Sequence, residues 1–169
     1  GVTLTINADT TGINNNGIKL EDISNGTVIV GSGVTVSVNT DTAIDAEGTT
    51  NAIITNSGTI SSGGAKTINF EPRTGASSGA TVNNNFGGTI TGAQNTIKTE
   101  GQVNITTNTT INNSGLISVT TSGRAIGPST GNDTGTVINN NSTGIIVKTS
   151  TADAAAEVIT LGNSGTIIN

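Results

Sequence analysis

The sequence predicts an all-β chain, folded as one right-handed parallel β-helix of about six coils over residues 1–169. Three observations predict this fold. A phrase built around Asn, Ser and Gly returns as ITNSGTI at 54–60, INNSGLI at 111–117 and LGNSGTI at 161–167. Apolar and polar residues alternate over short stretches that are rich in Val, Ile and Thr. Short strands joined by loops, repeating every few tens of residues, indicate a solenoid.

The repeat length follows from the glycine in each phrase and in its variants. The glycines aligned in this way are Gly26, Gly58, Gly88, Gly115, Gly144 and Gly165. Their spacings are 32, 30, 27, 29 and 21 residues, which vary about a mean near 28. Such variation is typical of coils with fixed strands and loops of different lengths. The long period favours a right-handed coil, because the left-handed form has a hexapeptide rhythm.

The elements are expected in a regular order along each coil. An N-terminal strand within residues 1–12 carries the alternating Val2, Leu4 and Ile6. Each later coil has an apolar anchor, such as Ile44 in TAID, then a strand that enters the asparagine turn and a strand that leaves it. One or two helical turns are the exception, expected over 150–159 in STADAAAEVI.

The asparagine turn is expected to be the corner of each coil. Its glycine would supply a positive φ angle without a Cβ penalty. Stacked amides would hydrogen-bond along the solenoid axis as a ladder. The ladder asparagines are predicted to be Asn56, Asn84, Asn113, Asn140 and Asn163, each with its glycine: Gly58, Gly88, Gly115, Gly144 and Gly165. The side chains expected to face inward are Ile44, Ile54, Ile60, Ile68, Val82, Ile90, Ile97, Ile111, Ile117, Ile126, Ile138, Ile146, Ile159 and Ile167.

These phrases, set in Thr- and Asn-rich coils without cysteine, resemble the passenger regions of bacterial autotransporters and related secreted β-helix adhesins. The resemblance covers residues 13–169 and implies a β-helix on the outer surface of a bacterium. The opening GVTLTINADTTG has neither a basic start nor a long apolar run, so we expect a mature or excised chain.

Composition argues against several functions. The net charge of −5 gives no electrostatic footprint for nucleic acid or anionic lipid, and no apolar run is long enough for a membrane helix. Histidine is absent, so a nucleophilic triad lacks its usual base. Trp and Tyr, on which sugar rings usually stack, are absent too. Of the two phenylalanines, Phe86 is expected to fill the core, with a position over the coil corner or an exposed one as the alternatives. We therefore expect a protein that is not an enzyme.

Carboxylates give the one candidate for a cofactor. Asp41, Asp45 and Glu47 form the densest acidic group, with Glu21 and Asp22 one coil earlier. Hard oxygen ligands suit calcium, so these residues are a candidate calcium site, with solvated loop carboxylates as the alternative. Glu71 and Arg73 are expected to form a surface ion pair.

The expected function is that of a structural subunit whose partner is another copy of itself. Uncapped coil ends present apolar columns and unpaired strands, which favour head-to-tail filaments on the cell surface with an adhesive or biofilm-matrix role. The residues expected at the joint are Val2, Leu4, Ile6, Ile167 and Ile168. The alternative is an excised passenger segment that binds host or neighbouring cells through loops 65–78 and 120–134. A polysaccharide-acting enzyme and an ice-binding protein are the remaining hypotheses.

Overall fold

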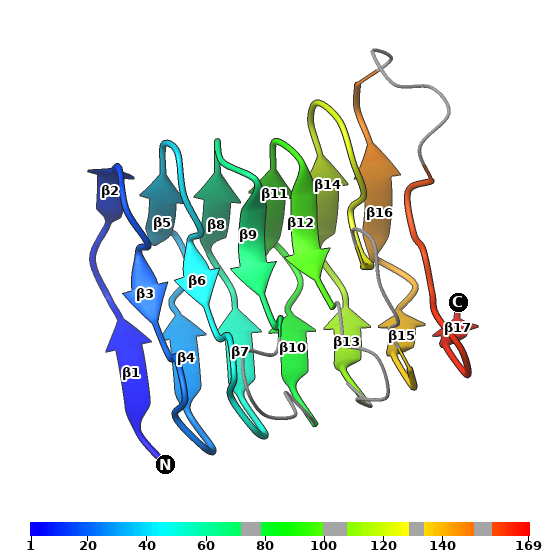
Figure 1. Ribbon diagram of the computed structural model, residues 1–169. Coiled ribbons are helices and arrows are strands. Elements are labelled where there is room, and N and C mark those ends of the chain that lie inside the picture. The colour runs from blue at the N-terminus through cyan, green and yellow to red at the C-terminus, as the bar shows by residue number, and fades with distance from the viewer. Residues whose placement is uncertain (72–78, 100–107, 129–133, 151–156) are drawn as a thin grey trace.

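The computed structural model describes residues 1–71, 79–99, 108–128, 134–150 and 157–169, and within these ranges it contains strands and turns but no helix (Figure 1). Every strand pairing in this part of the chain is parallel. The predicted all-β parallel β-helix is therefore confirmed.

The strands form three sheets. The first sheet holds β1 (Thr3–Ile6), β4 (Thr27–Val30), β7 (Ile53–Asn56), β10 (Thr81–Asn84), β13 (Thr110–Asn113), β15 (Val137–Asn140) and β17 (Thr166–Ile168). The second sheet holds β2 (Thr10–Ile13), β5 (Thr35–Val38), β8 (Thr59–Ser62), β11 (Thr89–Gly92), β14 (Leu116–Val119) and β16 (Ile145–Lys148). The third holds β3 (Ile18–Lys19), β6 (Ile44–Asp45), β9 (Lys66–Asn69) and β12 (Asn95–Lys98), and isolated bridges extend it through Ile126 to Ile159.

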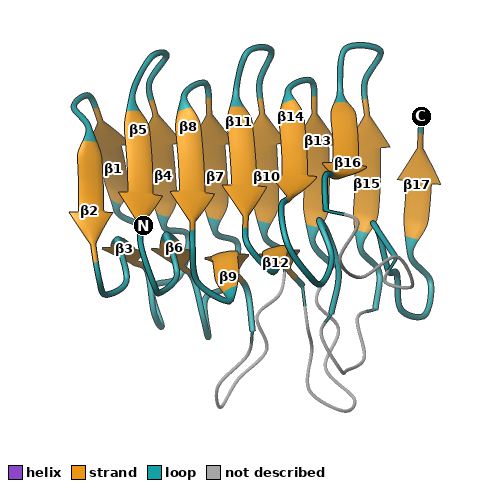
Figure 2. Cartoon of the chain, turned by 90° about the horizontal axis from the view of Figure 1, so that it is seen from above, coloured by secondary structure: helices purple, strands orange, loops and turns teal. Residues whose placement is uncertain are grey.

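The chain visits these sheets in turn, so each coil contributes one segment to each sheet. Figure 2 shows the first and second sheets as two layers, with β3, β6, β9 and β12 along one edge of them. The chain passes from each first-sheet strand to the next one in the stack, from β1 at one end to β17 at the other. This path confirms the three segments expected per coil. The right-handed sense of the coil stays a prediction.

Columns of identical or similar aliphatic side chains fill the interior. Val28, Ile54, Val82, Ile111 and Ile138 stack directly on one another across five first-sheet strands, and all are fully buried. Because parallel pairing without register shift repeats every position, one buried β-branched residue predicts the next. Ile18, Ile44, Ile68 and Ile97 make the equivalent column of the third sheet.

The predicted core is largely confirmed, with exceptions at the C-terminal end. Eleven of the fourteen residues are fully buried, whereas Ile146 and Ile159 are only partly buried. Ile167 was expected inside, but its side chain is 49% exposed. It continues the column of Ile138, but β17 is the last strand of the described stack and has a described neighbour on one side only.

Two further expectations are corrected. Phe86 is 79% exposed on a turn and does not fill the core, contrary to the preferred expectation; the core instead contains the fully buried Phe70. The loop expected over 65–78 includes strand β9, so its first part belongs to the third sheet. Its residues 72–78 lie outside the described residues, as do 129–133 of the second expected loop and 151–156 of the expected helix.

The alignment of the glycines mixed two different corners. Gly58, Gly88, Gly115 and Gly144 lie between a first-sheet strand and a second-sheet strand, whereas Gly26 and Gly165 come directly before first-sheet strands. The spacings of 32 and 21 residues are the two that join one kind of corner to the other. In consequence Asn163 is exposed and lies outside the ladder, and its predicted place is taken by Asn169.

The corner glycines are needed for close approach between coils. None of the predicted corner glycines has a positive φ angle, so the expectation of a left-handed corner was wrong. A Cβ atom on Gly88 would lie 2.7 Å from the main-chain oxygen of Asn56, and one on Gly115 would overlap the main-chain oxygen of Gly88. Main-chain oxygens in a hydrogen-bonded stack cannot shift to make room.

We therefore expect Gly115→Ala to destabilise the protein more than Gly33→Ala. Gly33 has a φ of 75° but open space around its Cα. Its substitution should cost about 1–2 kcal/mol for the left-handed backbone, whereas Gly115→Ala must separate two coils. Urea denaturation of both variants measures the difference. A smaller loss for Gly115→Ala than for Gly33→Ala would contradict the close-approach explanation.

Candidate functional site

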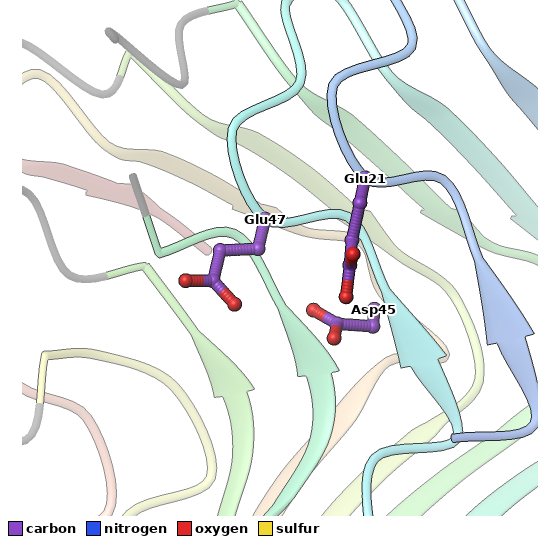
Figure 3. A group of neighbouring side chains, drawn as sticks. All are labelled: Glu21, Asp45 and Glu47. Carbon is purple, nitrogen blue, oxygen red and sulfur yellow. The ribbon is translucent and has the colours of Figure 1, made fainter. Parts of the chain in front are cut away.

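Three carboxylates from two consecutive coils meet beside the third sheet (Figure 3). Asp45 ends β6, Glu47 follows two residues later, and Glu21 stands two residues after the end of β3. Each residue offers an oxygen that lies within 4.8 Å of the oxygens offered by the other two. Because Lys19 of β3 pairs with Asp45, the chain that follows runs in step and brings Glu21 beside Glu47.

A sequence repeat marks this position, although it was not recognised from the sequence alone. The four-residue phrases IKLE, IDAE, INFE and IKTE begin at Ile18, Ile44, Ile68 and Ile97. These four isoleucines stack in one column, so the glutamates three residues later recur once per coil. Glu100, the last of them, lies outside the described residues. A column of glutamates places like charges on neighbouring coils, which opposes stacking unless cations or protons offset it.

Asp45 is the buried member of the group, with 5% of its surface exposed. Its two carboxylate oxygens accept hydrogen bonds from the side-chain amides of Asn16, at 2.8 Å, and Asn69, at 3.1 Å. Burial raises the pKa of Asp45, the neighbouring Glu21 and Glu47 raise it further, and the hydrogen bond from Asn69 acts in the opposite direction. Asp45 is thus a carboxyl group that holds its proton more tightly than a solvated aspartate.

Lysines offset the negative charge of two of the stacked glutamates, Glu21 and Glu71. The Nζ atom of Lys19 lies 2.8 Å from Glu21, and Glu71 receives both Lys66, at 2.8 Å, and Lys98, at 2.9 Å, on the same oxygen. Burial alone would raise the pKa of Glu71, but the hydrogen bonds and charges of these two lysines outweigh it and lower that pKa. Arg73, the expected partner of Glu71, lies outside the described residues.

The structure brings together only part of the predicted calcium site. Asp45 and Glu47 meet, but their third neighbour is Glu21 of the preceding coil. Asp41 is exposed and accepts a hydrogen bond from the main-chain N–H of Thr42 at 2.9 Å. Asp22 is also outside the group and adopts a φ of 58°. The sequence indicates that these acidic residues lie in neighbouring coils. Which of them come together depends on the register between β3 and β6, and this register brings Glu21 to Asp45 and Glu47.

Carboxylate oxygens so close together could hold a hard divalent cation such as calcium, and the calcium site stays a prediction. Sugar hydrolysis by paired carboxyl groups would need both groups to reach the substrate. Asp45 is nearly sealed from solvent and its two oxygens are already engaged by amides. This geometry suits a group that holds two coils together better than one that acts on a bound glycan.

The raised pKa of Asp45 predicts a specific pH dependence. A carboxyl group whose pKa is higher in the folded state stabilises the fold fully below its unfolded pKa, which is about 3.9. That contribution is lost as the pH rises through the folded pKa. We therefore expect the wild-type chain to lose stability relative to Asp45→Asn as the pH rises from acid to neutral.

Denaturant unfolding of both proteins across this pH range measures the difference. Glu71 contributes in the opposite direction, since its pKa is lowered and its stabilisation is lost as the pH falls. It is present in both proteins and cancels from the comparison. A difference that stays flat, or that grows in favour of the wild type with rising pH, would contradict the burial of the Asp45 carboxyl group.

An asparagine ladder runs along the corner between the first and second sheets. The Nδ2 atom of Asn56 donates to Oδ1 of Asn84 at 2.9 Å, and the same bond links Asn84 to Asn113 at 2.8 Å, Asn113 to Asn140 at 2.9 Å and Asn140 to Asn169 at 2.9 Å. The predicted ladder is confirmed for its first four members. Asn56, Asn84 and Asn113 are buried, so the ladder forms part of the core.

The main chain fixes the direction of this inner ladder. The N–H groups of Gly58 and Gly115 donate to the Oδ1 atoms of Asn56 and Asn113, at 3.2 and 3.3 Å. The Nδ2 atom of Asn84 donates to the carbonyl oxygens of Gly88 and Leu116, at 3.3 and 3.2 Å. Since a carbonyl only accepts and an N–H only donates, the amides cannot be flipped. Asn56, Asn84, Asn113 and Asn140 therefore all donate toward the C-terminal end.

A second, outer ladder runs the other way on the solvent side of the same strands. The Nδ2 atom of Asn112 donates to Oδ1 of Asn83, and that of Asn139 donates to Asn112, both at 2.8 Å. Asn112 and Asn113 are neighbours in β13. A comparison of the two therefore keeps the residue type, the strand and the kind of hydrogen bond constant, and changes only the face of the sheet.

We expect Asn113→Ala to cost much more stability than Asn112→Ala. Loss of Asn113 removes the Oδ1 atom that accepts from the buried Asn84 amide and from the partly buried N–H of Gly115, and an unsatisfied buried group costs about 1–3 kcal/mol. Water can replace the bonds of the outer ladder, so Asn112→Ala should cost no more than about 1 kcal/mol. Chemical denaturation measures both. Equal losses would contradict the structural role of the inner ladder.

The described stack of first-sheet strands begins with β1 and ends with β17. Among the described strands, β1 pairs only with β4, and β17 pairs only with β15. Val2 and Leu4 are exposed at the first end, and Ile167 and Ile168 at the second. Ile6, also predicted at the joint, is partly buried and packs against the core. Both ends therefore combine an unpaired strand edge with uncovered apolar side chains.

Comparisons with protein families, curated proteins and solved structures gave no match. The described part of the chain contains no long apolar helix of the kind that crosses a bilayer. The site and the ends described above are therefore the basis for the functional argument.

Proposed function

We propose that this chain is a non-enzymatic structural protein of a bacterial extracellular surface, a β-solenoid subunit that assembles end to end into filaments with an adhesive or biofilm-matrix role. The observation that carries the proposal is the in-register stack, in which every coil continues the columns of the one before it and the outermost described strands pair on one side only. In the described stack, the outermost strands each have one unpaired edge. Leu4 and Ile167 are the first and last side chains of the same interior column, and both are exposed.

An open strand edge is a template for pairing with another chain. The two ends of a solenoid are different surfaces, so contact between the first end of one copy and the second end of the next is heterologous. A heterologous contact that does not close into a ring propagates into a fibre. The partner in this proposal is another copy of the same chain, with no nucleic acid and no inserted membrane segment.

The stack itself suits a structural role. Its interior is a set of continuous aliphatic columns and a polar ladder, and its exposed faces carry mainly Thr, Ser and Asn. Among the described residues, one cluster of three carboxylates is found, and its member Asp45 is almost completely buried. These features support a rod whose ends and surface, more than any cleft, carry its function.

The same ends favour one alternative. If this chain is a segment of a longer passenger-type adhesin, further coils would cover both ends within one polypeptide, and adhesion would depend on loops. The resemblance of the corner phrases to autotransporter passengers supports this alternative. It predicts that the isolated chain associates through its ends only by accident and without a regular repeat.

Substitutions at the ends test the proposal. We expect the wild-type chain to form filaments at high concentration, and Leu4→Asp or Ile167→Asp to abolish them, because each places a charge in the column at the joint. Phe86→Asp is the matched control, since Phe86 is exposed but lies on a turn between β10 and β11. Sedimentation velocity and negative-stain electron microscopy measure the assembly.

Three outcomes have a clear meaning. Filaments in the wild type and Phe86→Asp, with monomers in both end variants, support assembly through the ends. A wild-type chain that stays monomeric at high concentration contradicts the proposal. Equal loss of filaments in all three variants shows an assembly that does not use the ends. Circular dichroism confirms that each variant is folded.

A further inference from the structure

Asn69 and Lys98 are buried neighbours on two strands of the third sheet. They are register partners in β9 and β12, which lie side by side in the stack (Figure 1). Their side chains are on the face opposite to the aliphatic column of Ile68 and Ile97, because successive residues of a strand point to opposite faces. Asn69 is nevertheless only 1% exposed and Lys98 only 6% exposed. A lysine and a carboxamide thus stand on strands about 4.8 Å apart, with little access to water.

The contacts of these two residues direct the amine toward the amide. The Nζ atom of Lys98 lies 2.9 Å from Oε2 of Glu71, so the lysine side chain extends toward the preceding coil. The main-chain N–H of Glu71 donates to Oδ1 of Asn69 at 3.3 Å, so the carboxamide lies beside the same short segment. On its other side, Nδ2 of Asn69 donates to Oδ1 of Asp45 at 3.1 Å. The amide is therefore held in place by the coil before it and by its own turn.

We propose that Lys98 and Asn69 form an intramolecular isopeptide bond, in which the lysine Nζ atom is joined to Cγ of the asparagine. The amine is the nucleophile, and the side-chain carboxamide is the acyl group that it attacks. Two groups held next to one another in a folded protein react at a high effective concentration, so a reaction that is negligible between free side chains becomes feasible. The product is a covalent link between the third and fourth coils, and it does not depend on assembly through the ends.

The reaction is a transamidation that releases ammonium. Lys98 gives one proton of its ammonium group to the carboxylate of Glu71, which it already contacts, and the neutral amine attacks Cγ of Asn69. The Nζ–Cγ bond forms and the Cγ–Nδ2 bond breaks. The departing nitrogen takes one proton from the attacking nitrogen and one from Glu71. Glu71 thereby returns to its carboxylate form, and the reaction consumes no other reactant.

The surroundings of Lys98 favour its amine as a nucleophile. Lys66 and Lys98 both contact Oε2 of Glu71, at 2.8 and 2.9 Å, so two like charges lie close together. Repulsion between like charges and burial both oppose the charged form of an ammonium group. Lys98 is the more buried of the two, with 8% of its side chain exposed against 25% for Lys66. Asp45 has a positioning role, since its oxygen holds the Nδ2 atom that departs.

Lys19 and Asp45 provide a comparison within the same column. They are register partners on β3 and β6, as Asn69 and Lys98 are on β9 and β12. The Lys19 side chain is 56% exposed, however, so its ammonium group stays solvated. Its neighbour is a carboxyl group, which would lose water in place of ammonia. We expect no covalent bond between Lys19 and Asp45.

Mass spectrometry of the intact wild-type chain under denaturing conditions tests the proposal. After incubation in the folded state, the chain should be lighter than its sequence by one ammonia molecule. Trypsin cleaves after lysine and arginine but not after a lysine whose Nζ atom is in an amide bond. Digestion should therefore leave the peptide 67–73 joined to the peptide 74–124, with no cleavage after Lys98. Fragment ions of this joined peptide locate the link.

Variants assign the link to its residues. Lys98→Arg keeps the positive charge and Asn69→Ala removes the acceptor, and both should have the full mass of their sequences. Glu71→Gln lacks the proton acceptor, so it should form the link far more slowly than the wild type. Lys19→Arg is the matched control and should lose ammonia as the wild type does. Circular dichroism establishes that each variant is folded.

Three results would overturn the proposal. The first is a wild-type chain that keeps the full mass of its sequence after prolonged incubation. The second is a loss of ammonia that persists in Lys98→Arg, because it would place the loss at another asparagine, such as Asn16 or Asn25, which precede glycine. The third is a loss of water in place of ammonia, which would assign the link to a carboxyl group. None of these results bears on filament formation, so the proposed function is tested separately.

Discussion

The structure depends on one constraint: along the stacked strands, a residue lies directly on the residue in the same position of the neighbouring coil, about 4.8 Å away. Identical aliphatic side chains satisfy this constraint inside, as in the column from Val28 to Ile138. At the later corners, where a main-chain carbonyl lies close to the next coil, glycine avoids a clash with that oxygen and the asparagine amides pass hydrogen bonds from coil to coil. The composition of the chain, rich in Ile, Val, Asn and Gly, follows from these requirements.

The same constraint creates demands that the repeat alone does not meet. Carboxylates that recur at one position repel one another, so Glu21 and Glu71 are paired with lysines and Asp45 is held by two amides. The outermost strands of the described stack, β1 and β17, each have a described neighbour on one side only. Another coil in the same register would satisfy the constraint there, and the proposed function assigns that coil to a second copy of the chain.

Much of this fold could be predicted from the sequence. Because stacked coils place equivalent residues on one another, both the repeated Asn-Gly phrase and the repeated apolar positions indicate the same coil. Eleven buried aliphatic residues and four ladder asparagines were identified in this way. The phrase at 161–167 misled the alignment, since identical letters occur at two different corners and only strand pairing distinguishes them. The cluster of three carboxylates was predicted only in part. Asp41 is close to Asp45 in the sequence, whereas Glu21 is close to Asp45 in space because the two neighbouring coils pair in register.

The buried inner ladder is the most direct consequence of stacking in register, and hydrogen exchange of its side-chain amides measures it. In a nuclear magnetic resonance experiment, the Nδ2 protons of Asn56, Asn84 and Asn113 should exchange with solvent far more slowly than those of Asn83 and Asn112, which belong to the outer ladder. Comparable exchange rates for the two sets would contradict the account, because coils that are out of register cannot bury a continuous line of amides.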